Sequence, residues 1–125
     1  KDRGYKMKKL IIIVLISFLI VGCTSTPQFS NKKIDREITV TASNWKFEPA
    51  QINVKKGETI KLNVKSTTGT HGLYISGLDV KTKSISVGKQ ESVVFKADKV
   101  GTFSFSCNIY CGSGHREMKG SLIVK

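Results

Sequence analysis

The chain has 125 residues, of which 39% are hydrophobic, and its 21 Lys and Arg against 9 Asp and Glu give a formal net charge of +12. This length allows one small domain with a single core. A basic chain can bind nucleic acid, but no basic-aromatic recognition motif appears, so we expect no nucleic-acid partner.

The amino-terminal segment has the pattern of an export signal. Met7 is followed by two lysines, a 12-residue apolar run over residues 10–21, and Gly22-Cys23. A positive start, a short apolar stretch and a small residue before the cut describe a secretory signal, whereas a membrane-spanning helix needs roughly 17–25 residues. We expect residues 1–6 to be upstream sequence read in frame and residues 7–22 to be the signal peptide. A short uncleaved anchor is the alternative.

The end of this signal resembles a bacterial lipobox, Ile-Val-Gly-Cys, in which the cysteine carries the lipid. Cys23 is therefore the expected lipidation site, and the polar residues 23–33 are predicted to form a flexible, lipid-anchored tether. This predicts a domain held at the extracytoplasmic face of a bacterial cell membrane. From Cys23 onward the chain keeps 16 basic against 8 acidic side chains. Such a surface either aids solubility or attracts anionic lipid, cell-wall polymers or an acidic partner.

Residues 34–125 alternate apolar and polar side chains. The clearest case is Ile60, Leu62 and Val64, with polar residues between them. Similar short stretches lie at residues 38–40, 52–54, 73–75, 85–87, 93–95, 103–107 and 118–124. Alternation broken by Gly and Asp/Lys turns predicts short antiparallel strands, and seven or eight of them predict an all-β, two-sheet sandwich. No helical period is present in this region.

The soft metal ligands of this domain are concentrated. One is His71, and the others lie in the segment CNIYCGSGHREM, which covers residues 107–118: Cys107, Cys111, His115 and Met118. Thiolates, imidazoles and a thioether together form a donor set suited to copper. Gly112 and Gly114 permit a tight loop and argue against a helix.

The parity of the flanking strands indicates how this loop is held. Cys107 ends a strand whose inward side chains are Phe103 and Phe105, and Met118 begins a strand whose inward side chains include Leu122. Two core strands would therefore hold the ends of the loop at one end of the sandwich.

Three other interpretations of the cluster remain open at this stage. Cys107 and Cys111 are able to form a disulfide, because exported cysteines tend to oxidise. A Cys2His2 zinc site is possible, although zinc does not call for the methionine. A thiol nucleophile served by a histidine is the third, but a second thiol and a thioether add nothing to that chemistry.

The loop, with His71 upstream, resembles the CuA centre of cytochrome c oxidase subunit II. Similarity to that cupredoxin domain extends over roughly residues 38–125, through the stretches NWKFEP, KGE, HG and KGSLIV. The resemblance is closest to the short subunit II of B-family haem–copper oxidases. It implies a cupredoxin-like Greek-key β-sandwich over residues 34–125.

The resemblance also implies the ligands. Cys107 and Cys111 would each bridge two copper ions, and His71 and His115 would cap one copper each. The weak axial ligands would be Met118 and the backbone carbonyl of Ile109. An ordinary blue-copper site needs only one cysteine, so the second cysteine favours the binuclear centre.

Three positions call for comment. Many family members have a glutamate where Ile109 stands, so only its carbonyl is expected to serve. The family often has an aspartate shortly before the upstream histidine, and here residues 67–70 are Thr-Thr-Gly-Thr. A hydrogen bond that orients His71 must therefore come from a hydroxyl or the backbone. Trp45 lies in a stretch resembling the aromatic region where electrons enter the family's copper site, and a core position is the alternative.

The implied function is that of a membrane-tethered electron carrier with a binuclear copper centre. It would be the subunit II-like entry module of a cytochrome c oxidase, taking electrons from a cytochrome c-type donor and passing them to a haem–copper subunit I. By itself it would catalyse no reaction. The alternative is a stand-alone copper-binding cupredoxin lipoprotein that delivers copper or carries electrons to another acceptor.

Overall fold

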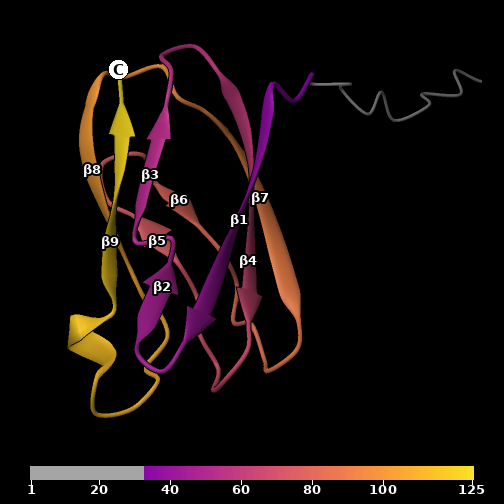
Figure 1. Cartoon of the computed structure of the whole chain (residues 1–125), viewed down its shortest axis with the longest axis vertical. Coiled ribbons are helices and arrows are strands. Elements are labelled where there is room, and N and C mark those ends of the chain that lie inside the picture. The colour runs from indigo at the N-terminus through magenta and orange to yellow at the C-terminus, as the bar shows by residue number, and fades with distance from the viewer. Residues whose placement is uncertain (1–32) are drawn as a thin grey trace, which may run out of the picture. The chain divides into compact units, whose positions relative to one another are not determined.

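The computed structural model describes residues 33–125, which form a sandwich of two β-sheets (Figure 1). The strands of this part are β1 (Arg36–Ser43), β2 (Lys46–Glu48), β3 (Gln51–Val54), β4 (Thr59–Ser66), β5 (Tyr74–Ile75), β6 (Val80–Lys81), β7 (Gln90–Lys96), β8 (Gly101–Ser106) and β9 (Lys119–Val124). The predicted signal peptide, the lipidation site Cys23 and nearly all of the predicted tether lie outside the described residues.

The strands are arranged in two sheets, with the orders β2-β1-β4-β7 and β3-β9-β8-β5-β6. The prediction of an all-β two-sheet sandwich is therefore confirmed. The expectation of antiparallel strands throughout is wrong for two pairs, because β1 with β4 and β3 with β9 run parallel. Alternation of side chains has the same period in both kinds of pairing, so the sequence pattern does not distinguish them.

The core lies between the two sheets. Phe47 of β2 and Phe105 of β8 are both buried and meet edge to face, with ring centroids 5.4 Å apart and planes at 72°. Aromatic pairs prefer this geometry, and each ring buries a large apolar area. Ile60, Leu62 and Val64 are also buried, so the strand with the clearest alternation is a central core strand.

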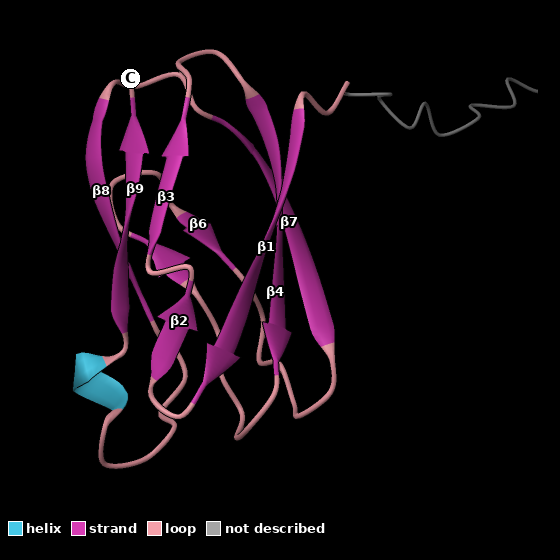
Figure 2. Cartoon of the chain, viewed as in Figure 1, coloured by secondary structure: helices cyan, strands magenta, loops and turns pink. Residues whose placement is uncertain are grey.

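Some predicted strands differ from the observed ones. Residues 85–87 form no strand: Ile85 makes a single bridge to His71, and the side chain of Val87 is 57% exposed. The very short β2 and β6 were not predicted, because two or three residues cannot display a period. The described residues also include one turn of 3-10 helix, His115–Glu117, drawn in cyan in Figure 2. Within residues 33–125 no helix has the length and apolar character needed to cross a membrane.

The predicted attachment of the ligand loop to two core strands is confirmed. β8 ends immediately before Cys107 and β9 begins immediately after Met118, and both side chains are buried. The Cys107 N–H donates to the carbonyl oxygen of Met118 at 3.1 Å. Paired strands in the five-stranded sheet thus hold both ends of the loop, which lies at the end of the sandwich opposite the carboxyl terminus (Figure 1).

Candidate metal centre

His71 is fully buried and held from two sides. Its backbone pairs with Ile85, with N–H···O distances of 3.1 and 2.8 Å. Its ring Nε2 lies 2.6 Å from the carbonyl oxygen of Thr68. A carbonyl oxygen only accepts, so the proton must be on Nε2 and the lone pair on Nδ1. The expectation that the backbone or a hydroxyl would orient His71 is confirmed, and the partner is backbone.

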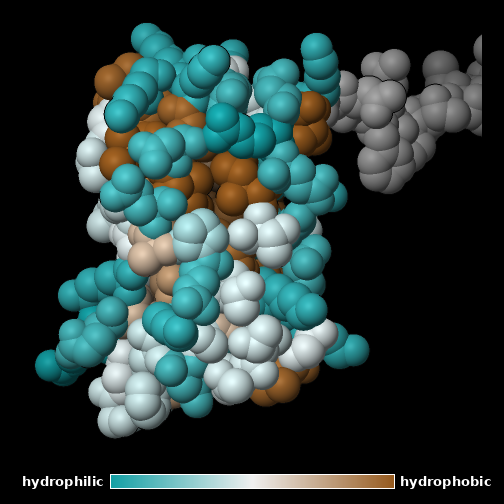
Figure 3. Space-filling view, in the orientation of Figure 1, coloured by the Kyte–Doolittle hydropathy of each residue, from teal (hydrophilic) through white to brown (hydrophobic). Residues whose placement is uncertain are grey.

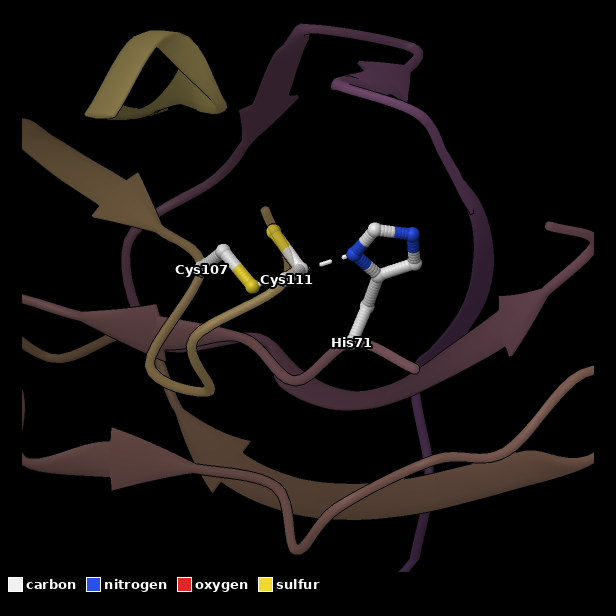
Figure 4. Close-up of side chains that lie close together, drawn as sticks. All are labelled: His71, Cys107 and Cys111. Carbon is white, nitrogen blue, oxygen red and sulfur yellow. Dashed lines mark hydrogen bonds between the residues drawn. The ribbon is translucent and has the colours of Figure 1, made fainter. Parts of the chain in front are cut away.

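The free nitrogen of His71 faces the two cysteines (Figure 4). Nδ1 lies 3.9 Å from the Sγ atom of Cys107. The ligand atoms of His71, Cys107 and Cys111 all lie within 4.8 Å of one another, and both cysteines are free thiols. His71 lies 36 positions before Cys107 in the chain, yet the fold brings its imidazole and the two sulfurs together.

The other three predicted site residues lie against this group. Nδ1 of His115 is 3.5 Å from Sγ of Cys111, and Sδ of Met118 is 4.0 Å from the same sulfur. The thiol of Cys107 donates to the carbonyl oxygen of Ile109 at 3.1 Å, so that carbonyl points toward the sulfurs. The structure therefore brings together all six residues that were expected to form the site.

The surroundings of Cys111 favour its neutral thiol. Burial, and after it the neighbouring Cys107 thiol, raise the pKa of Cys111 to about 11. A metal binds the thiolate, so metal binding here would release protons. Burial also reduces the access of water to the donors.

Three residues that the sequence analysis did not single out shape the site. The carbonyl of Thr68 orients His71, as described above. A Cβ at Gly72 would overlap the side-chain amide of Asn108, so glycine here allows the ligand loop to lie against the His71 segment. Thr82 accepts from the Asn108 amide at 3.3 Å through its carbonyl, and from the Leu73 N–H at 2.9 Å through its hydroxyl. Periodicity carries no signal for contacts of this kind.

Trp45 is not a core residue, so the alternative of a core position is wrong. Its side chain is 39% exposed, and its indole N–H donates to the carbonyl oxygen of Cys111 at 3.0 Å. The tryptophan therefore lies against the ligand loop, with part of its ring open to solvent.

The donor set fits copper. Soft sulfur ligands select Cu(I), and imidazole accepts copper in either oxidation state. A hard cation such as calcium or magnesium would require oxygen ligands, which this buried group does not supply apart from the Ile109 carbonyl. Zinc would use the thiols and imidazoles but would leave the thioether of Met118 without a role.

Comparisons with known proteins agree with this fold and this site. The chain matches the family profile of the cupredoxin-like domain over residues 10–124. It is 28% identical over 88 residues to cytochrome c oxidase subunit 2 of Thermus thermophilus, across 70% of this chain and 64% of that protein. The chain thus spans less than two thirds of this relative. The predicted resemblance to subunit II is confirmed by this match.

Solved structures share the fold at low sequence identity. The periplasmic domain of cytochrome oxidase subunit II of Bradyrhizobium japonicum superposes with a TM-score of 0.67 at 20% identity, over 74% of this chain and 86% of that one. The structure of a heme-copper terminal oxidase dimer superposes with a TM-score of 0.65 at 19% identity, over 99% of this chain and 98% of that one. Auracyanin of Roseiflexus castenholzii superposes with a TM-score of 0.63 at 20% identity, over 74% of this chain and 99% of that one. The extent of the profile match shows that the chain belongs to the cupredoxin-like domain family.

Proposed function

We propose that this chain is an electron-transfer protein whose loop end holds a binuclear copper centre of the CuA type. The observation that carries the proposal is the meeting of two free thiols with the lone pair of His71, all within 4.8 Å of one another, where His71 and Cys107 are buried and Cys111 is half-buried. When bound, a copper pair supplies reversible one-electron chemistry with little change in bond lengths. The protein's part is to hold the ligands rigidly and to keep water away.

Each ligand role rests on a contact within the site. Cys107 and Cys111 would bridge the two coppers, because their sulfurs lie between the two histidines. His71 and His115 would each cap one copper through Nδ1, which faces a sulfur in both residues. Met118 and the carbonyl of Ile109 would be the weak axial ligands, and each lies against one of the two thiols. A single blue copper would leave one thiol without a role.

We further propose that the chain serves as the subunit II-like electron entry module of a cytochrome c oxidase. It would accept electrons from a cytochrome c-type donor and pass them to a haem–copper oxidase subunit I. Support comes from the match to subunit 2 of Thermus thermophilus and from the fold shared with a heme-copper terminal oxidase. Alone it would be a carrier, and the oxidase activity would belong to the complex.

The same proposal includes the place of the domain in the cell. Cys23 would carry the lipid, and residues 23–33 would tether the domain to the extracytoplasmic face of a bacterial membrane. Support comes from the lipobox-like sequence and from the fold shared with a periplasmic domain. A single acyl chain binds membranes only marginally, so stable attachment would need more than one lipid chain or a partner protein.

The decisive experiment is to load the purified chain with copper under reducing and then oxidising conditions. We expect two coppers per chain and a purple mixed-valence spectrum, both lost in Cys107→Ser. Cys23→Ser is the matched control, because it removes the remaining cysteine of the chain and should leave copper loading unchanged. One blue copper per chain, or tightly bound zinc without redox activity, would contradict the binuclear assignment.

A stand-alone copper lipoprotein is the second candidate. It is favoured by the fold match to auracyanin, in which this fold makes up 99% of the chain. Purification from native membranes separates the two candidates. A haem protein that co-purifies with the chain supports the oxidase module, whereas a copper-loaded chain free of haem supports the stand-alone carrier.

A further inference from the structure

The turn between β1 and β2 contacts both segments that carry the metal donors. The backbone N–H of Asn44 donates to the hydroxyl of Thr68 at 2.9 Å, three residues before His71. The indole N–H of Trp45 donates to the carbonyl oxygen of Cys111 at 3.0 Å. Two adjacent residues thus join segments that lie more than 40 positions apart in the chain.

The contact with the ligand loop is close-packed. A Cβ at Gly112 would lie 3.3 Å from the indole nitrogen of Trp45, and a Cβ at Gly114 would overlap the ring. The two glycines thus allow the ring to cover the loop between Cys111 and His115. The indole hydrogen bond and this packing act on the same short stretch of backbone.

The contact with the histidine segment is equally direct. A Cβ at Gly69 would lie 2.7 Å from the side-chain oxygen of Asn44 and 3.1 Å from Nε2 of His71. The hydroxyl of Ser66 donates to the Gly69 carbonyl at 2.8 Å, and the Thr68 carbonyl accepts from His71. Movement of the Asn44 turn would therefore be passed on to the imidazole through Thr68 and Gly69.

The direct polar contact between the stretch that ends at His71 and the ligand loop is weak by comparison. Among the described residues, the polar contact that joins residues 66–71 to residues 107–118 is the 3.9 Å approach of the Cys107 thiol to His71. A thiol is a poor hydrogen-bond donor, and this distance is long even for sulfur. Before copper arrives, the pairing of β5 with β8 and the packing of Gly72 against Asn108 hold the segments together on the carboxyl-terminal side of His71. On its amino-terminal side the corresponding contact is made by the Asn44 turn.

We propose that Asn44 and Trp45 form a bracing turn that, together with the pairing of β5 and β8, sets the separation between His71 and Cys111. The turn contributes no ligand. It holds two loops in place, and the relative position of these loops decides whether the imidazole and the thiols can bind the same metal. Residues that are not ligands themselves commonly orient metal ligands in this way. Its relevance to electron transfer rests on the proposed copper function, but the mechanical coupling itself does not.

The test uses three single variants of the full chain. Trp45→Phe keeps a ring over the loop and removes the indole N–H. Thr68→Val keeps the backbone carbonyl and removes the hydroxyl that accepts from Asn44, at an exposed position. Tyr110→Phe is the control: it lies on the same loop, is 81% exposed, and keeps the ring that lies 5.7 Å from the ring of His115.

Amide hydrogen exchange of the metal-free protein is the first readout. Loss of one ordinary hydrogen bond corresponds to about a 2- to 10-fold faster local opening. Each substitution should speed exchange in the segment that the changed side chain does not contact. We expect Trp45→Phe to speed exchange in residues 66–71, and Thr68→Val to speed exchange in residues 107–118. The bracing role is overturned if exchange becomes faster only in the segment that the changed side chain contacts. It is also overturned if the exchange rates equal those of Tyr110→Phe. Unchanged thermal unfolding excludes global loosening as the cause.

The second readout is the copper-loaded protein. Both bracing variants should shift the reduction potential and the visible spectrum, whereas Tyr110→Phe should not. The double variant should shift them by less than the sum, because both substitutions break one link. If no variant and no parent chain takes up two coppers, the proposed function fails while the exchange result still decides the bracing role. If copper binds normally and neither potential nor spectrum moves, the bracing role is wrong.

Discussion

The two ends of the sandwich are built in different ways. The end that carries the carboxyl terminus closes with short turns and with hydrogen bonds between neighbouring strand ends. The N–H of Lys55 donates to the Glu58 carboxylate at 2.9 Å, and the N–H of Gly57 donates to the Ala97 carbonyl at 2.7 Å. Figure 3 shows hydrophilic residues at this end, interspersed with hydrophobic ones. The lysines at residues 55–56 and 96–99 are exposed.

The opposite end is made of longer segments that depend on one another. His71 and the ligand loop arrive from different sheet strands, and the bracing turn lies against both of them. The comparison shows that one end is closed by hydrogen bonds between the ends of neighbouring strands, whereas the geometry of the other end depends on contacts among the His71 segment, the ligand loop and the Asn44 turn. Substitutions at the loop end should therefore change copper binding, whereas substitutions at the turn end should change only stability.

The largest expected difference comes from His71→Ala compared with Lys99→Gln. Removing His71 takes away a donor that faces both thiols. Copper affinity should fall at least about 100-fold, because removing a residue that merely orients a ligand already lowers affinity by up to about that factor. Lys99→Gln at the turn end should leave copper affinity unchanged. Competition titration against a Cu(I) chelator measures both, and equal affinities would refute the assignment of His71 as a ligand.

A smaller effect is expected from Glu58→Ala at the turn end. Glu58 accepts from the Lys55 N–H and lies 3.7 Å from Arg36 in a partly exposed ion pair. Loss of the hydrogen bond should lower the free energy of unfolding by about 1 kcal/mol, with little added by the ion pair. Denaturant unfolding measures this change. Copper loading should not change, and a loss of copper would show that the two ends are coupled.

The smallest effect concerns pH. The pKa of Cys111 is raised by burial, so the folded metal-free protein holds this proton more tightly than the unfolded chain. The corresponding stability is fully present below the unfolded pKa and is lost as the pH rises toward about 11.

Unfolding midpoints measured under reducing conditions at several pH values should thus decline more steeply for the parent chain than for Cys111→Ser. Lysines and tyrosines also titrate in this range, but they are shared by both proteins, so the comparison isolates the thiol. Parallel declines would mean that the Cys111 thiol is as well solvated in the folded protein as in the unfolded chain.

Much of the fold could be predicted because alternation reports burial directly. The parity of Phe103, Phe105 and Cys107 predicted where the ligand loop leaves the core, and β8 and β9 lie there. The pattern failed where strands are too short to have a period, as in β2 and β6. It also failed at Ile85, whose burial comes from contact with the His71 segment rather than from a strand.

The site was predicted unevenly for a related reason. Its donors are rare residue types, so their concentration in residues 107–118 stands out in the sequence. The residues that orient them are ordinary: the Thr68 backbone, Gly72 and Thr82. Trp45 was noticed, but the choice between the core and the ligand loop depended on the direction of a turn, which alternation does not encode.

The amino-acid sequence by itself determined the chemistry that is available: two thiols, two imidazoles and a thioether on a chain that alternates as a sandwich. Only the tertiary structure decided that His71 meets Cys107 across 36 positions, with its lone pair toward the sulfurs. Local sequence sets backbone preferences and burial, which act over a few residues. The distance between two loops is set instead by the packing of the strands that carry them and by the turn that joins them.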